Sequence, residues 1–308
     1  MKRFFVALAA LGLAASVAIA QDFNAAVEAF NAGAQALESN KTEALTQFRS
    51  ALALAQAVEG DDAAELAGKC KDAITSTLMS IAKEQINEAA YDDALATLGE
   101  AKTVAAEYEA AAVAEEADKL IPNVYMRKGS TLLKEKDFAG ASAAFEQLIA
   151  LTPEDGQAQL LLGQAKMQSG DLAAATVALE KAAELGKADQ ANKLLGTAYL
   201  KEGQALLKAG KNAEAIAALE KCNSYGENAN AYKLIASAYT KSGKNKEAIN
   251  AYKKYLEVSP NAKDAADIKF TIAATAQKAG DKATAKEYYG KLAGTKYAAQ
   301  AEAQLKTL

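Results

Sequence analysis

The feature that most constrains this 308-residue chain is a pattern of small and large residues that returns after 34 positions. In the segment 122–155, Gly129 and Ala141 are small and Phe145 is large. The next unit repeats this order with Gly163, Ala175 and Leu179. A small residue lets two helices approach closely, and a large one fills the space between their ridges. The pattern therefore predicts a chain built from repeated pairs of packed helices.

Each unit has the spacing of two short amphipathic helices. In the first, Tyr125, Gly129 and Leu132 lie four and three residues apart, which places them on one helix face. In the second, Ala141 and Phe145 continue the same spacing. Residues 117–147 aligned on residues 191–221 share 13 identical positions of 31. The same supersecondary unit is thus expected at several places along the chain.

An alanine in the second helix marks each unit. The seven marker alanines are Ala44, Ala94, Ala141, Ala175, Ala215, Ala248 and Ala285. We predict an all-α chain of about seven helix-turn-helix repeats. Residues 21–120 are expected to hold acidic, degenerate repeats, residues 121–293 five clearer ones, and residues 294–308 a C-terminal capping helix. Nothing marks a helix break between Ala101 and Leu120, and Pro122 is expected to start or kink the next helix.

The period, the small and large positions and the proline at the end of a repeat resemble the tetratricopeptide repeat family. The tryptophan usual at the fourth position is absent, because the chain has no Trp, and Tyr125, Tyr199 and Tyr232 stand there. The resemblance implies a right-handed α-solenoid whose first helices line a concave face. It also implies a partner-binding groove on that face. The candidate groove residues are Met126, Ser130, Leu133, Lys134, Leu160, Gln164, Gln168, Leu200, Gln204, Lys208, Lys233, Ser237, Lys241, Phe270 and Lys278.

Lysine occupies the thirteenth position in four of the five clearer repeats, at Lys134, Lys208, Lys241 and Lys278. A row of lysines along a groove would suit an acidic peptide or glycan. The alternative is that lysine is common on exposed helix surfaces without any ligand. Both interpretations are kept.

The N-terminus has the pattern of a secretory signal peptide, residues 1–20. A basic start at Lys2 and Arg3 precedes an apolar run, which ends at the small-residue site Ala18-Ile19-Ala20. We expect cleavage before Gln21, an exported protein in the periplasm or the medium, and no membrane span after cleavage.

The two cysteines are predicted to remain free thiols. Cys70 falls in the second repeat and Cys222 in the fifth. Helices pack about 8–10 Å apart, whereas a disulfide needs Cα atoms within about 7 Å. Intervening repeats therefore keep Cys70 and Cys222 from pairing.

The composition argues against catalysis. The chain contains no His, which removes the commonest general base and most zinc sites. No phosphate-binding glycine loop occurs. We expect no enzyme activity, no cofactor and no metal. Nucleic acid is not an expected partner, because the lysines are interspersed with acids and the net charge is −4.

The charge is unevenly spread. Residues 21–120 hold 7 basic against 19 acidic residues, a formal charge of −12, and residues 121–308 hold 26 against 20, a charge of +6. The main hypothesis is an extracytoplasmic scaffold that binds a partner protein or peptide. The alternative is an accessory protein that binds an acidic envelope polymer or glycan through the lysines.

Overall fold

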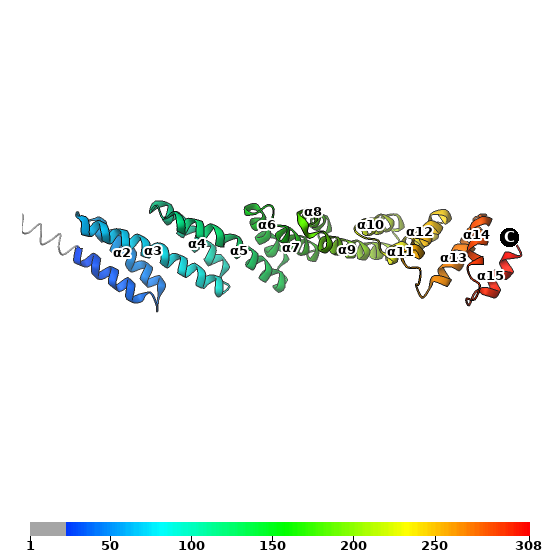
Figure 1. The fold of residues 1–308 in the computed structure, drawn as a ribbon, viewed down its shortest axis with the longest axis horizontal. Helices are drawn as coiled ribbons and strands as arrows, with labels where there is room; N and C mark the ends of the chain where they lie inside the picture. The colour runs from blue at the N-terminus through cyan, green and yellow to red at the C-terminus, as the bar shows by residue number, and fades with distance from the viewer. Residues whose placement is uncertain (1–22) are drawn as a thin grey trace, which may run out of the picture. The chain divides into compact units, whose positions relative to one another are not determined.

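The computed structural model describes residues 23–308, so the predicted signal peptide lies outside the described residues. The chain forms two compact units that divide between Pro153 and Glu154. We describe each unit by itself. All regular structure in the described part of the chain is helical, as the sequence predicts (Figure 1).

The first unit contains three helix hairpins. A helix at residues 23–36 pairs with α2 (Lys41–Gln56), α3 (Asp61–Asn87) with α4 (Tyr91–Glu107), and α5 (Ala111–Glu135) with α6 (Phe138–Leu151). Each helix packs mainly on the helices before and after it in the chain, which is the arrangement of a helical repeat.

The second unit contains four hairpins and a terminal helix. The hairpins are α7 (Gly156–Gln168) with α8 (Leu172–Ala182), α9 (Ala188–Lys208) with α10 (Asn212–Ser224), α11 (Ala229–Lys241) with α12 (Asn245–Val258), and α13 (Ala265–Lys278) with α14 (Lys282–Gly290). Helix α15 (Ala298–Leu305) follows. The described residues therefore confirm the predicted number of repeats and the C-terminal helix; the predicted handedness stays a prediction.

The small and large positions meet inside each hairpin. A Cβ added at Gly129 would lie 2.6 Å from the Phe145 ring, and one at Gly163 or Gly203 would lie 2.5 Å from Leu179 or Leu219. Phe145, Leu179 and Leu219 are fully buried. The glycine is thus required for the close approach of the two helices, as the repeat pattern predicts.

The turns of the two units use different residues. In the second unit, Gly170, Gly210, Gly243 and Gly280 adopt positive φ where a first helix ends. In the first unit, Ala89 and Lys136 adopt φ of 61° and 66° at the ends of first helices, and Glu109 adopts φ of 60° after the second helix α4. Glu109 makes the break between α4 and α5 that the sequence did not reveal, because a glycine was the expected signal.

The predicted boundary at residue 120 falls inside a helix. Helix α5 runs from Ala111 to Glu135 and includes Pro122 in its interior. The third repeat therefore starts at Ala111, before the proline. Proline lacks the N–H that would bond the carbonyl four residues earlier, so one helical hydrogen bond is missing there without ending α5.

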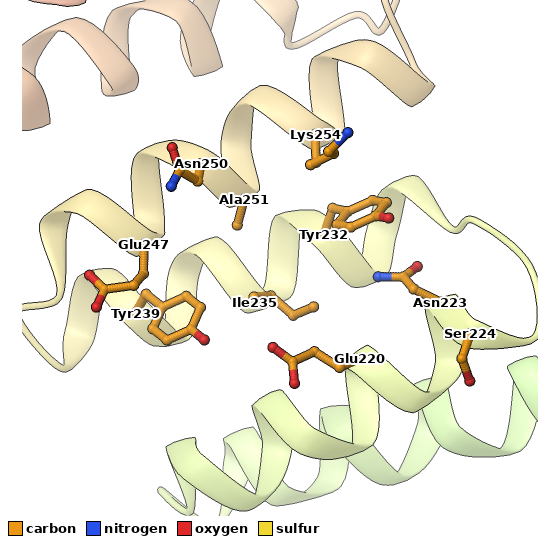
Figure 2. A pocket seen from close by; sticks show the side chains of 10 residues that line it. All are labelled: Glu220, Asn223, Ser224, Tyr232, Ile235, Tyr239, Glu247, Asn250, Ala251 and Lys254. Atoms are coloured by element: carbon orange, nitrogen blue, oxygen red, sulfur yellow. The ribbon is translucent and has the colours of Figure 1, made fainter.

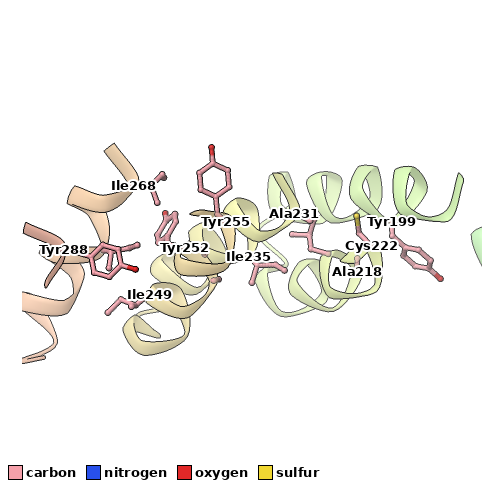
Figure 3. Packing of buried hydrophobic residues seen from close by; sticks show 14 of the residues in the cluster. Tyr199, Ala218, Cys222, Ala231, Ile235, Ile249, Tyr252, Tyr255, Ile268 and Tyr288 are labelled. Atoms are coloured by element: carbon pink, nitrogen blue, oxygen red, sulfur yellow. The ribbon is translucent and has the colours of Figure 1, made fainter. Parts of the chain in front are cut away.

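The core of the second unit is continuous across successive helices. Figure 3 shows buried side chains from Tyr199 and Cys222 through Ile235 and Tyr252 to Tyr288. The core of the first unit contains Cys70, Ile74, Leu78 and Phe48. Both cysteines are free and fully buried, one in each unit, as predicted.

The terminal helix closes the second unit. The Phe270 ring of α13 stacks on Tyr297 at 4.6 Å between centroids and meets the Tyr289 edge at 5.8 Å. Gln304 of α15 accepts a hydrogen bond from Gln277 at 2.9 Å. Across residues 23–308, every helix is too short or too polar to cross a membrane.

Candidate functional site

The predicted groove residues are divided between the two units. Met126, Ser130, Leu133 and Lys134 lie on α5 in the first unit, and the other eleven lie on α7, α9, α11 and α13 in the second. Within the second unit, α7 contacts α9 and α9 contacts α11, so their residues occupy neighbouring first helices. The structure therefore brings most of the predicted residues into one unit.

Some predicted residues are not available to a partner. Leu160 is only 4% exposed and belongs to the core of the second unit, so its prediction as a groove residue is wrong. Phe270 is stacked against Tyr297. Lys233 donates to Asp264 at 2.5 Å. Each of these side chains is held by an intramolecular contact that the repeat position alone does not reveal.

The remaining predicted residues fall into two groups by exposure. Met126, Ser130, Leu133, Gln164, Leu200 and Ser237 are partly buried, whereas Lys134, Gln168, Gln204, Lys208, Lys241 and Lys278 are exposed. The four exposed lysines all lie in the last turn of a first helix. A cation there interacts favourably with the helix dipole whether or not a ligand binds. Their recurrence has this structural cause in addition to any role in binding.

A groove that the sequence did not indicate lies on the face formed by the second helices. We name it the α11 groove. Its volume is about 530 Å³, and its lining residues are Glu220, Asn223, Ser224, Tyr232, Ile235, Tyr239, Glu247, Asn250, Ala251 and Lys254. Figure 2 shows Tyr232, Ile235 and Tyr239 along α11, with Glu220 projecting from α10 and Glu247 from α12.

The first unit has a groove in the same frame, the α5 groove, with a volume of about 470 Å³. Seven lining positions of the two grooves differ by 107 in residue number, the offset between the marker alanines Ala141 and Ala248. The matched pairs are Tyr125 and Tyr232, Lys128 and Ile235, Leu132 and Tyr239, Gly140 and Glu247, Ala143 and Asn250, Ala144 and Ala251, and Gln147 and Lys254. The groove is thus a property of the repeat.

The two grooves differ in their charges. In the α5 groove, Lys128 forms an ion pair with Asp92 of the preceding second helix. In the α11 groove, the matched residue is Ile235, which is buried. Lys254 at its edge pairs with Glu257 at 2.7 Å. Glu220 and Glu247 form no ion pair within the described part of the chain, although the Lys244 ammonium lies 5.9 Å from the centroid of the Tyr239 ring.

The tyrosines of the α11 groove lie close to these acids. Burial, and next the carboxylates of Glu220 and Glu247, raise the pKa of Tyr239. Burial, and next Glu227, raise the pKa of Tyr232, whose hydroxyl donates to Glu227 at 3.3 Å. Both phenols are therefore neutral hydrogen-bonding groups at neutral pH, in a negative environment.

One amide in the groove has a donor without a partner. The Asn223 side-chain oxygen accepts the backbone N–H of Asn228 at 2.9 Å, which fixes the orientation of the amide. Its nitrogen is buried and has no described partner. A buried donor of this kind favours a carbonyl oxygen on any group that enters the groove.

The arrangement contains no group of acids or cysteines that could hold a metal ion among residues 23–308. The two buried thiols lie in the hydrophobic cores, where burial raises the pKa of Cys70 and of Cys222. Protonated buried thiols are poor nucleophiles. The α11 groove offers hydrogen-bonding, charged and aromatic side chains.

Stacks of helix hairpins with tight turns define this chain as an α-helical repeat protein. The tetratricopeptide repeat family model matches residues 126–193 and 200–266. The chain thus resembles tetratricopeptide repeat proteins, and those segments carry the repeats.

Several solved structures are similar. The MamA crystal structure is 24% identical, covering 56% of this chain and 89% of that chain, with a TM-score of 0.32. MamA 41-end from Desulfovibrio magneticus RS-1 is 20% identical, covering 56% and 93%, with a TM-score of 0.31. YrrB, titled a TPR protein with an unusual peptide-binding site, is 17% identical, covering 60% and 91%, with a TM-score of 0.30. A comparison with curated proteins found no match.

Proposed function

We propose that the protein is an exported scaffold that binds a partner polypeptide on its helical repeat surface. The observation that supports this most strongly is the groove that recurs in one repeat frame, once in each unit. Repeats of this kind present extended surfaces suited to another chain. Partner binding needs no reaction centre, which agrees with the absence of His from the sequence.

Affinity capture from the protein's own envelope fraction tests the scaffold. We expect one polypeptide partner to be retained at both low and high salt, because a packed interface is less sensitive to ionic strength than exposed charges are. The identity of the retained protein is then read by mass spectrometry. Recovery of no specific polypeptide at either salt concentration would contradict the proposed function.

Export is supported by the basic start, the apolar run and the small residues Ala18-Ile19-Ala20. Mass spectrometry of the protein from fractionated cells tests it. We expect a mature N-terminus at Gln21 in the periplasm or the medium. A protein that retains the N-terminal apolar run and is found in the cytoplasmic fraction would refute export while leaving the scaffold proposal intact.

The alternative function, binding of an acidic envelope polymer or glycan, is favoured by Lys208, Lys241 and Lys278. These lysines are exposed at the ends of first helices in one unit and have no ion pair within residues 23–308. Changing all three to Glu tests this function. Polymer binding should then be lost, and binding by the unchanged protein should weaken steeply with salt. Polymer binding that is unaffected by the three substitutions and by salt would exclude this alternative function.

A further inference from the structure

The repeat frame that forms the α11 groove recurs over α9 and α13, where side chains of the chain itself contact one another. Over α9, Tyr225 stacks on Tyr199 with centroids 5.9 Å apart and an angle of 17°. The Tyr225 hydroxyl donates to Glu180 of the preceding second helix at 2.6 Å. A planar ring with a donor therefore occupies this position from within the chain.

The contacts over α13 are different. Lys253 stands at the frame position of Glu180, five residues after its marker alanine. Its ammonium lies 5.4 Å from the centroid of the Tyr288 ring, which is 8% exposed. Lys291 lies over the same ring at 4.4 Å. Here the cations and the aromatic ring all come from the chain itself.

The α11 groove has the same frame, and at its Tyr239 end the Lys244 ammonium lies 5.9 Å from the ring centroid, whereas its Tyr232 end is not covered in this way. Tyr232 stands at the position of Tyr199, and Glu220 at the position of Glu180. The position of Tyr225, ten residues after the marker alanine, is Val258. No ring stacks on Tyr232 among the described residues, and Glu220 has no hydrogen bond or ion pair there. The groove therefore leaves open the ring of Tyr232 and the carboxylate of Glu220, which correspond to the ring and the carboxylate that Tyr225 contacts over α9.

The charge of the α11 groove indicates which chemical group would bind there. Glu247 adds a second carboxylate beside Tyr239, and Glu227 lies at the far end beside Tyr232. In the first unit the matched groove pairs its lysine, Lys128, with Asp92, whereas Lys254 of the α11 groove pairs with Glu257 and leaves Glu220 and Glu247 without an ion pair. A neutral ring would leave the acids of the α11 groove unpaired, whereas a cation would pair with them.

Arginine fits these surfaces better than lysine does. Its guanidinium is planar, so it can stack on an aromatic ring while its N–H groups donate to carboxylates on either side. Asn223 supplies a buried amide donor for a carbonyl oxygen, which a polypeptide backbone provides. A polypeptide segment thus satisfies both the acids and the amide.

We propose that the α11 groove binds an arginine side chain of the partner polypeptide, with the guanidinium against Tyr232 and paired with Glu220 and Glu247. The proposal rests on the proposed scaffold function and names the chemistry of one contact. The partner therefore carries an exposed arginine in the segment that reaches this groove.

The test is a titration of the purified, isotope-labelled protein followed by NMR. The probe is the tripeptide acetyl-Ala-Arg-Ala-amide, and the matched control is the same tripeptide with citrulline, which keeps the shape and loses the charge. We expect saturable shift changes confined to α10, α11 and α12 for the arginine peptide. Shift changes of equal size with citrulline, or none with arginine, would overturn the proposal.

Four variants locate the contact. Glu220→Gln and Glu247→Gln should each weaken binding about tenfold, because each removes a charge-assisted hydrogen bond. Val258→Tyr should abolish binding by supplying the ring found over α9. Glu214→Gln, at the frame position of Glu247 in the preceding repeat, is the control and should bind as the unchanged protein does. Thermal unfolding of each variant confirms that it folds. Undiminished binding by Glu220→Gln and Glu247→Gln would place the arginine elsewhere.

Two further measurements separate the possible failures. Free L-arginine in place of the tripeptide distinguishes a small-molecule site, and tighter binding of the free amino acid would contradict a polypeptide ligand. Capture of the natural partner by a Glu220→Gln/Glu247→Gln variant distinguishes the two proposals. Undiminished capture would refute the arginine contact and leave the scaffold intact, whereas no partner for either protein would refute the scaffold.

Discussion

A glycine where two helices of a hairpin cross sets how closely their backbones approach. Gly129 faces the fully buried Phe145 ring, and no space remains for a Cβ. Gly99, in the middle of α4, has no atom within 4 Å of such a Cβ. Gly129 is therefore needed for packing, whereas Gly99 only lowers the helix propensity of α4.

We expect Gly129→Ala to lower the free energy of unfolding by about 1–3 kcal/mol through overpacking. Gly99→Ala should raise it by about 0.5–1 kcal/mol, because alanine is the better helix former. Urea unfolding followed by circular dichroism measures both. Equal effects of the two substitutions would mean that the Phe145 ring can move aside.

A second residue-scale feature is the contact of Lys233 and Tyr255 with one carboxylate. Both donate to Asp264 at 2.5 Å. The bonds from Lys233 and Tyr255 hold the pKa of Asp264 below its usual value, and burial, with the bond to Asp264, raises the pKa of Tyr255 to about 12. This cluster links neighbouring repeats.

The raised pKa of Tyr255 predicts a loss of stability at high pH. An unfolded tyrosine titrates near pH 10. The contribution of Tyr255 is therefore fully present below about pH 10 and is lost as the pH rises toward 12. The free energies of unfolding of the unchanged protein and of Tyr255→Phe should therefore approach each other as the pH rises from about 10 to 12. Parallel curves would contradict the assigned bond. The contribution of Asp264 is present above about pH 4 and is lost as the pH falls below that value.

At the scale of elements, the terminal helix α15 is held in part by an aromatic contact. Tyr297, at its N-terminus, stacks on Phe270, and Ala301 is buried against the helices it covers. A last repeat needs such a cover because its outer apolar face has no following repeat.

We expect Tyr297→Ala to cost about 1–2 kcal/mol of stability, since it removes the ring stacking and part of the burial of Phe270. Hydrogen exchange in α13, α14 and α15 should quicken, whereas Gln300→Ala, on the exposed side of α15, should leave it unchanged. Unchanged exchange in Tyr297→Ala would show that α15 is held by its other contacts.

The elements were largely predictable because the marker alanines and their large partners are sequence-local. The break at Glu109 was not, since a glutamate rarely takes the backbone conformation that glycine adopts freely. The α11 groove was missed for another reason. Tyr225 contacts Tyr199 and Glu180 only because the end of its helix faces the preceding helices, and the sequence does not show this orientation. Leu160 was misassigned because its burial depends on the packing of neighbouring hairpins.

At the scale of the whole molecule, the two cysteines belong to different cores. Cys70 lies in the first unit and Cys222 in the second, and both are fully buried. Export to an oxidising compartment would favour a disulfide only if the thiols could meet.

We therefore expect the folded protein to show no reaction with a thiol reagent on the time scale of minutes, and two reactive thiols after denaturation without reductant. Intact mass spectrometry before and after alkylation reads the number directly. A mass two hydrogens lower, with no thiol released by denaturation, would reveal a disulfide and contradict the separation of the two cores.

The ring that Tyr225 places on Tyr199 has a consequence for valency. Over α9 a single residue at the end of a second helix, Tyr225, covers the Tyr199 ring, while the helices around it are the same as in the next repeat. A unit with two open grooves could hold a polypeptide at two points, and the second contact would then form at high effective concentration. With Val258 in one repeat and Tyr225 in the repeat before it, the proposed arginine contact would be a single point of attachment on α9 to α12.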